Sequence, residues 1–137
     1  MSEVVVELER RFLPKLAEVA RQIERDFSAV RARSWSAPVG SATAYQGHTV
    51  GLACLFPGAP ANVPDGLGLD ISVRHLTAAP ELAGAYVAWH HPSGACEIDL
   101  FEAPVPYSAE ALAALDARFG ELIEAVRQAV NRGRPPE

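Results

Sequence analysis

Residues 85–101 read AYVAWHHPSGACEIDLF, and this stretch decides the fold because it predicts a β-hairpin with two chemically different faces. Pro92, Ser93 and Gly94 are strong turn residues between two runs of strand formers. With Ser93 and Gly94 as a two-residue loop, the predicted register pairs His91 with Cys96, His90 with Glu97, Trp89 with Ile98 and Val87 with Leu100. A slip of one residue in the loop would change this assignment.

The two faces of the hairpin differ because side chains alternate along a strand. One face is apolar and is expected to pack on a core: Val87, Trp89, Cys96, Ile98 and Leu100. The other, which we call the front face, mixes polar and aromatic side chains: Tyr86, Ala88, His90, Glu97, Asp99 and Phe101. The hairpin therefore predicts a sheet with one covered side and one polar side.

Two further stretches show the same alternation of apolar and polar or small residues. In residues 67–74, Leu67, Leu69, Ile71 and Val73 alternate with Gly68, Asp70, Ser72 and Arg74. In residues 48–56, the apolar side carries Val50, Leu52, Cys54 and Phe56, and the other side carries Thr49, Gly51, Ala53 and Leu55. A shorter strand at 41–45, joined through Gln46 and Gly47, completes a predicted antiparallel sheet of four or five strands.

The N-terminal part of the chain predicts a long amphipathic helix over residues 5–30. Its apolar residues recur every three or four positions. They are Val5, Leu8, Phe12, Leu16, Val19, Ile23, Phe27 and Val30. Ser2 is a suitable N-cap, and Pro14 either kinks this helix or marks its start, because proline lacks an N–H and clashes with the preceding turn.

A C-terminal helix is bounded more sharply. Ser108 is expected to cap it, Tyr107 and Leu112 stand where a hydrophobic staple forms, and Gly133 followed by prolines ends it. Its apolar stripe is Leu112, Leu115, Phe119, Leu122, Ile123, Val126 and Val130. Two helices and one sheet, each with an apolar face, predict a two-layer α+β domain with both helices on the same side of the sheet.

The composition indicates a single globular domain over residues 1–137. A hydrophobic content of 49% is enough for a core without metal or disulfide staples. The net charge of −5 disfavours binding to nucleic acid or to anionic membranes. The sequence shows no signal-peptide core and no apolar run of membrane-spanning length, which predicts a cytoplasmic protein. Eleven arginines against one lysine are typical of a GC-rich bacterial genome.

The cysteines and histidines form no recognisable chemical motif. Cys54 and Cys96 both fall on the predicted apolar face, so we expect reduced, buried and inert thiols. His90 and His91 are adjacent in a strand and point to opposite faces, which prevents them from binding one metal together. His48 and His75 stand near strand ends. No spacing typical of a metal site, a nucleophile or a phosphate-binding loop is present, so we expect neither metal nor cofactor.

The front face holds the candidate binding residues. They are Asp70, Ser72, Arg74, Tyr86, His90, Glu97, Asp99 and Phe101. Tyr86, Phe101 and Leu55 beside small residues make an apolar spot rimmed by charge, which is typical of protein contact surfaces. The sequence therefore predicts a protein-binding module of chaperone, immunity or adaptor type, together with homodimerisation through the sheet.

Two alternatives use the same residues differently. A carboxylate beside an imidazole raises its basicity, so His90 with Glu97 and Asp99 would suit a small enzyme or a ligand-binding domain. A metal-binding protein would need a histidine of the hairpin to meet His75 or a cysteine. The organisation is similar in outline to bacterial secretion chaperones and immunity proteins, but no residue motif accompanies that likeness.

The sequence also predicts two loops and the extent of burial of two side chains of the hairpin. Residues 57–66, PGAPANVPDG, and residues 77–84, TAAPELAG, are predicted to be loops, and either one could form a lip at an end of the sheet. Trp89 is expected to be buried and costly to truncate, whereas Glu97 is expected to lie in a weak, exposed pair.

Overall fold

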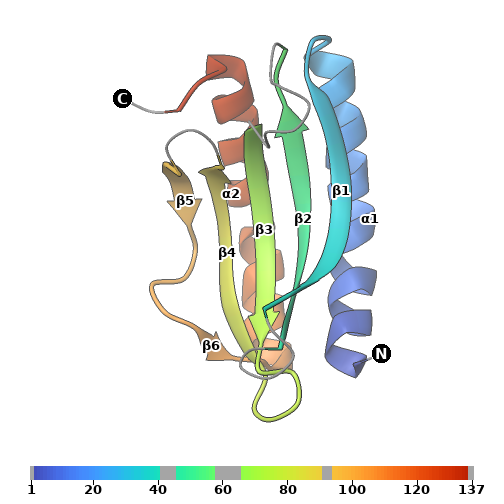
Figure 1. Ribbon diagram of the computed structural model, residues 1–137, viewed down its shortest axis with the longest axis vertical. Coiled ribbons are helices and arrows are strands. Elements are labelled where there is room, and N and C mark those ends of the chain that lie inside the picture. Colours follow the sequence, from blue (N-terminus) through green and yellow to red (C-terminus); the bar gives the residue numbers. More distant parts are fainter. Residues whose placement is uncertain (1, 41–45, 58–65, 91–93, 136–137) are drawn as a thin grey trace.

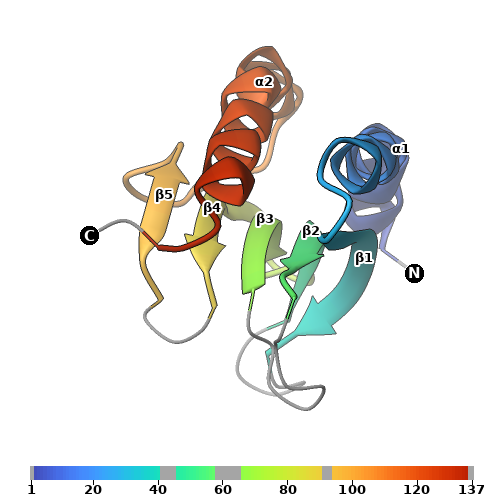
Figure 2. The same ribbon diagram turned by 90° about the horizontal axis from the view of Figure 1, so that it is seen from above.

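The computed structural model describes residues 2–40, 46–57, 66–90 and 94–135. One antiparallel sheet is covered on a single face by an N-terminal and a C-terminal helix (Figures 1 and 2). This arrangement confirms the predicted two-layer α+β sandwich. None of the helices in the described ranges has an apolar stretch of the length required to cross a bilayer.

The sheet has a simple topology. The elements are α1 (Glu3–Asp26), β1 (Arg31–Val39), β2 (Gly47–Leu55), β3 (Gly66–Arg74), β4 (Glu81–Trp89), β5 (Cys96–Asp99), β6 (Val105–Pro106) and α2 (Ala109–Arg132). Strands β1 to β5 lie side by side in chain order, and β6 pairs with the start of β4. The predicted strand at 41–45 and most of the 57–66 connection lie outside the described residues. The 77–84 connection is shorter than predicted, because β4 begins at Glu81.

Strand β1 was not predicted. Its sequence, RARSWSAPV, has no apolar alternation, and Pro38 cannot donate to a ladder hydrogen bond. It forms because all nine of its residues pair with β2, from Arg31 opposite Leu55 to Val39 opposite Gly47. Proline is tolerated there because β1 is the end strand of the sheet.

Helix α1 begins at Glu3, so Pro14 lies inside it and does not mark its start. The Val4 N–H donates to the Ser2 hydroxyl oxygen at 3.1 Å, as expected of the N-cap. The helix ends at Asp26, earlier than predicted, and Val30 nevertheless remains buried just before β1.

Helix α2 has the predicted ends. The Ala111 N–H donates to the Ser108 hydroxyl oxygen at 3.0 Å. Gly133 ends the helix in the left-handed region, at φ 76°, where a side chain would be strained.

The core lies between the helices and the sheet. Helix α1 packs on β1 and β2, and α2 packs on β3, β4 and β5 (Figure 2). The two helices meet through the stacked rings of Phe12 and Phe119, whose centroids are 5.8 Å apart. Beside these rings, Arg11 contacts Asp116 at 3.0 Å, and Lys15 contacts the same carboxylate. The apolar sides of β2, β3 and β4 are buried against this layer, as predicted.

The hairpin of β4 and β5 has a different register from the predicted one. Val87 lies opposite Ile98, not Leu100, and Ala88 lies opposite Cys96, with an irregularity between Val87 and Ala88. The loop is therefore longer than two residues, and the bulge adds one residue to β5. Because of this extra residue, Cys96 lies on the front face and Glu97 lies on the helix side, which is the reverse of the prediction.

Glu97 belongs to the helix side of the sheet, which corrects its assignment to the front face. The Trp89 indole N–H donates to its carboxylate at 2.7 Å, and Arg132 of α2 pairs with the same oxygen. Only 10% of the Glu97 side chain is exposed. The expectation of a weak, exposed pair is therefore wrong, because Glu97 joins the hairpin to the end of α2.

We expect Glu97→Ala to lower the free energy of unfolding by about 1–3 kcal/mol, because it leaves the Trp89 N–H and the Arg132 guanidinium without their acceptor. Glu97→Gln keeps a neutral acceptor and should lose less. Urea denaturation of both variants provides the test. Equal losses from the two variants would show that side-chain volume, and not hydrogen bonding, matters at this position.

The two cysteines have different environments. Cys54 is buried, as predicted, and burial raises the pKa of its thiol to about 12. Cys96 is exposed, which corrects the expectation that both are buried. Partial burial, together with the nearby Asp99 carboxylate, raises the pKa of the Cys96 thiol as well. Neither thiol is therefore activated as a nucleophile.

Candidate binding site

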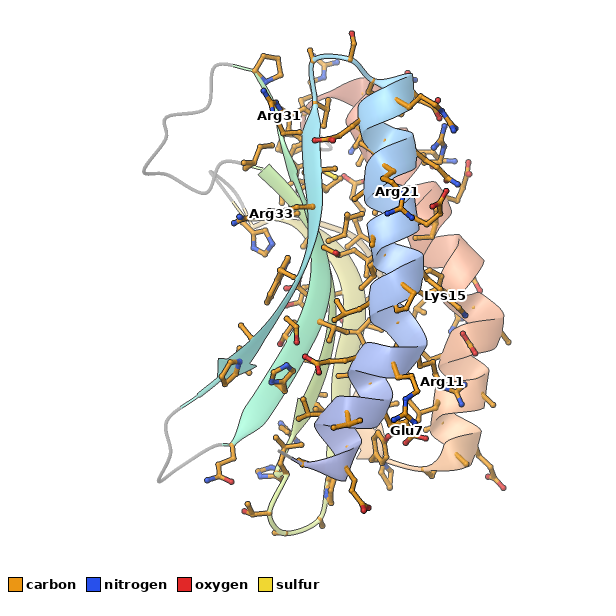
Figure 3. The ribbon with its side chains drawn as sticks, turned by 90° about the vertical axis from the view of Figure 1, so that its right-hand side faces the viewer. Glu7, Arg11, Lys15, Arg21, Arg31 and Arg33 are labelled. Atoms are coloured by element: carbon orange, nitrogen blue, oxygen red, sulfur yellow. The ribbon has the colours of Figure 1, made fainter. Side chains whose placement is uncertain are left out.

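One row of residues crosses the front face from edge to edge. Pairing aligns Trp35 of β1, Gly51 of β2, Asp70 of β3, Tyr86 of β4 and Asp99 of β5. No helix in the described part of the chain covers this face, and the strands bow toward the helices, so the front face is concave (Figures 2 and 3). Asp70 therefore lies on the central strand of a concave surface.

The floor around Asp70 is built from small residues. The row on one side of it contains Ala53, Gly68 and Ala88, and the row on the other side contains Thr49, Ser72 and Gly84. With so little side-chain bulk, larger neighbours can lie flat on the sheet.

Two side chains use this space. A Cβ placed on Gly51 would lie 2.8 Å from the Trp35 ring, and one placed on Gly68 would lie 2.1 Å from the Nε2 atom of His90. The indole thus lies over Gly51, and the imidazole lies over Gly68, next to Asp70. His90 was predicted on this face, whereas Trp35 was missed because β1 was not recognised as a strand.

Asp70 is the unusual group of the site. Only 7% of its surface is exposed, although it sits on the face without helices. The Tyr86 hydroxyl donates to its Oδ2 atom at 3.1 Å, whereas its buried Oδ1 atom has no hydrogen-bond partner among the described residues. Burial raises the pKa of this carboxyl, and the charge of nearby His90 and the Tyr86 hydrogen bond act in the opposite direction. A buried polar atom left unpaired is costly, which makes Oδ1 an available acceptor.

The surroundings of Asp70 are acidic and hydrogen-bonding. Burial and the carboxylates of Asp70 and Asp99 raise the pKa of Tyr86 to about 12, so the phenol keeps its proton. On the next row, the Thr49 and Ser72 hydroxyls are 2.8 Å apart. The central group is therefore a carboxylate with a neutral donor on one side and a free oxygen on the other.

The remaining predicted residues take other roles. Arg74 pairs with Glu81 at 3.1 Å, away from the central row. Asp99 is exposed and accepts a hydrogen bond from the Phe101 N–H at 3.1 Å. Phe101 packs against the hydrophobic core and is not a front-face side chain, because the chain turns after β5. The structure thus brings Asp70, Tyr86 and His90 together and separates Glu97 from them.

A second polar cluster, absent from the sequence-based predictions, lies under α1. The Ser36 hydroxyl is 2.6 Å from the Glu9 carboxylate and 2.6 Å from His48 Nε2. A serine hydroxyl has one proton, so donation to Glu9 requires His48 to donate to Ser36 through its Nε2–H. Burial lowers the pKa of His48, and the Glu9 charge opposes that shift. This cluster fastens β1 and β2 to α1.

We expect this cluster to make stability depend on pH. His48 has a pKa of 6.5 when unfolded and a lower one when folded, so the stability it provides is present above pH 6.5 and is lost as the pH falls through the folded pKa. His48→Gln should therefore reduce the loss of stability on acidification. Denaturation of both proteins across this pH range provides the measurement, and parallel pH profiles would contradict the assignment.

The described residues contain no group of three or more His, Cys, Asp or Glu side chains arranged to hold a metal ion. Comparison with protein-family models, with curated proteins and with solved structures finds no match to this chain.

Proposed function

We propose that this chain is a cytoplasmic bacterial protein-binding module that receives a cationic side chain of its partner at Asp70, on the front face of the sheet. The observation that carries the proposal is the buried Asp70 carboxylate with an unpaired oxygen at the centre of that face. Burying such a group stabilises a protein only when a donor pairs with it. A Lys or Arg side chain of the partner would provide that donor.

The neighbours of Asp70 favour a cation. Asp99 adds a second negative charge to the same row, and Arg74 of β3 is paired with Glu81. Arg33 lies on the same face, but it belongs to the edge strand, two strands away from Asp70. The Trp35 and Tyr86 rings lie on either side of Asp70 in this row, where aromatic faces attract cations. His90 is the exposed side chain beside the carboxylate, so its rotation would open the site without any change in the backbone.

A partner protein fits this face better than a second copy packed sheet to sheet. Among the described residues, Leu55 is the one large apolar side chain that is exposed, at 40%. Interfaces between identical subunits usually bury a more apolar surface than this. The partner is therefore expected to recognise charge and hydrogen bonding at the centre of the face.

Native mass spectrometry of the tagged chain recovered from its own host tests the proposal. The wild-type chain should carry a second polypeptide, Asp70→Asn should be recovered without it, and Glu110→Gln, which removes an exposed carboxylate on α2, should retain it. A wild-type chain recovered alone or as a homodimer contradicts the proposal. So does a partner that remains bound to Asp70→Asn.

A further inference from the structure

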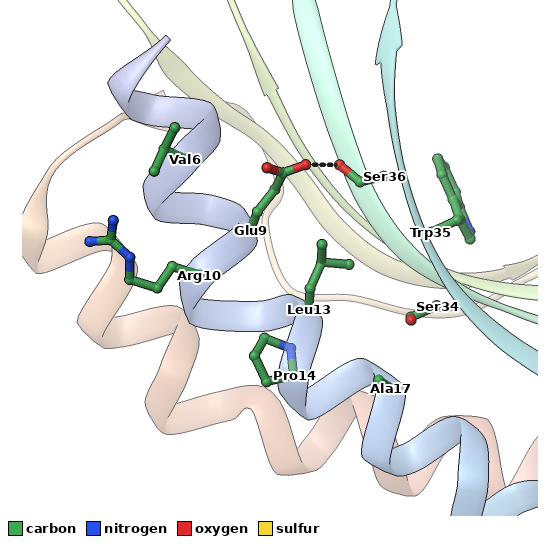
Figure 4. Close-up of a pocket in the computed structure, with 9 residues that line it drawn as sticks. All are labelled: Val6, Glu9, Arg10, Leu13, Pro14, Ala17, Ser34, Trp35 and Ser36. Atoms are coloured by element: carbon green, nitrogen blue, oxygen red, sulfur yellow. Dashed lines mark hydrogen bonds between the residues drawn. The ribbon is translucent and has the colours of Figure 1, made fainter. Parts of the chain in front are cut away.

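Two arginines of the edge strand, Arg31 and Arg33, form no ion pair within the described part of the chain. Most other described cations form ion pairs, namely Arg11, Lys15, Arg21, Arg25, Arg74, Arg118, Arg127 and Arg132. Arg10, Arg31 and Arg33 have no such pair with any described carboxylate. Arg31 and Arg33 belong to β1 (Figure 3), whereas Arg10 lies on α1 with its side chain directed away from β1 (Figure 4). In a protein with a net charge of −5, β1 thus carries two arginines and no carboxylate.

The same edge offers unpaired backbone groups. Strand β1 is the end of the sheet and pairs with β2 on one side. The Ala32 N–H points away from β2, because it donates to Glu24 at 3.0 Å. In an antiparallel pair, every second residue directs its N–H away from the partner strand. The N–H groups of Ser34 and Ser36 therefore point away from β2, as that of Ala32 does. Pro38 is the next residue in this series and has no N–H. Within the described structure, the N–H groups of Ser34 and Ser36 have no ladder partner.

A groove runs beside these two serines. It has a volume of about 570 Å³ and lies between α1 and the middle of β1 (Figure 4). Its apolar lining comes from Val6, Leu13, Pro14 and Ala17. The groove exists because the residues of β1 that face α1 are small, Ala32, Ser34 and Ser36. It has room for an apolar side chain.

We propose that β1 binds an acidic, extended segment of a partner protein, which adds to the sheet as an extra strand. The segment would accept hydrogen bonds from the Ser34 and Ser36 N–H groups, place its carboxylates near Arg31 and Arg33 and insert an apolar side chain into the groove. Main-chain pairing gives such strand additions affinity, and side-chain contacts give them specificity. The Glu24 contact at one end and Pro38 at the other limit the added strand to the middle of β1.

Charge distinguishes this partner from a second copy of the chain. In two copies paired through Ser34 and Ser36 around a two-fold axis, Arg33 would lie opposite Ala37 and Arg31 opposite Val39. A second copy would therefore leave both arginines without an acidic partner. An acidic segment is favoured by the same arginines, whose positions in β1 share the front face with Trp35. The hydrogen bonds of this proposal use the outer edge of β1 and do not involve Asp70.

Selection of short random peptides displayed on phage, against the tagged full-length chain, tests the proposal. The selected peptides should carry acidic residues at alternating positions with an apolar residue nearby. Their affinity, measured by calorimetry with synthetic peptide, should fall at least about tenfold in Arg31→Glu/Arg33→Glu. The matched control is Arg21→Glu/Arg118→Glu, which makes the same charge change at exposed helix positions and should retain the affinity.

Amide hydrogen exchange adds a readout that does not depend on mutation. Addition of a selected peptide should slow the exchange of the Ser34 and Ser36 N–H groups at least about tenfold, because both become ladder donors. The inference is overturned by peptides without acidic enrichment, by equal affinity of the two charge-reversal variants, or by unchanged exchange at both serines. Protection of both serines in the free protein, together with a dimeric mass, would assign the edge to a second copy instead. Asp70→Asn should leave peptide binding unchanged, so the outcome is independent of the front-face proposal.

Discussion

Trp89→Ala is expected to lower the free energy of unfolding by about 3–5 kcal/mol, the largest loss of stability that we predict for a single side chain. The ring is 3% exposed and stacks on Phe56, with centroids 5.2 Å apart. Its truncation leaves a cavity on the helix side of the sheet and also removes the donor to the Glu97 carboxylate. Both effects act in the same direction, and urea or thermal denaturation measures their sum.

Trp35→Ala is the matched control, because it removes the same side chain from the opposite face of the sheet. Trp35 is half-buried and lies over Gly51, with no helix behind it among the described residues. We expect a smaller loss of stability than in Trp89→Ala. Equal losses would show that the front face is as tightly packed as the core, and would count against a binding surface there.

Asp70→Asn is expected to abolish partner binding and at the same time to raise the free energy of unfolding at neutral pH by about 1–3 kcal/mol. The amide oxygen still accepts a hydrogen bond from Tyr86, while the buried negative charge is removed. Substitution of a residue that is needed for folding lowers the stability of the protein. Substitution of a residue that is needed for binding can raise the stability, because functional groups are often held at a cost in stability.

The dependence on pH separates this effect from a change in packing. The pKa of Asp70 is raised in the folded protein, so its protonated form favours folding at low pH, and that contribution is lost as the pH rises through the folded pKa. The advantage of Asp70→Asn over the wild type should therefore shrink on acidification toward the pKa of an unfolded aspartate. Denaturation at neutral and acidic pH measures this difference. A destabilised Asp70→Asn at neutral pH would show that the carboxylate is structural.

Much of the architecture follows from local sequence patterns. Alternating apolar residues located β2, β3 and most of β4, and the cap at Ser108 located the start of α2. Pro14 left the start of α1 open between Ser2 and Pro14. These signals are visible in sequence because each depends on residues close together in the chain. Asp70 and Tyr86 were also placed correctly on the polar face, since that assignment needs only the period of two within one strand.

Structural features that depend on residues far apart in the chain were not predicted from local sequence patterns. Strand β1 has no apolar alternation and exists because β2 provides a ladder for it, so Trp35 and the cluster of Glu9, Ser36 and His48 were missed with it.

The sequence by itself determined the two helices, the central strands and the position of Asp70 on the front face, because alternation and capping act within a few residues. Tertiary structure alone decided the edge strand, the hairpin bulge that moved Glu97 to Trp89 and Arg132, and the unpaired oxygen of Asp70. These features depend on which strands pair, in which register, and on what packs above them. Such interactions join residues far apart in the chain, and no local pattern specifies them.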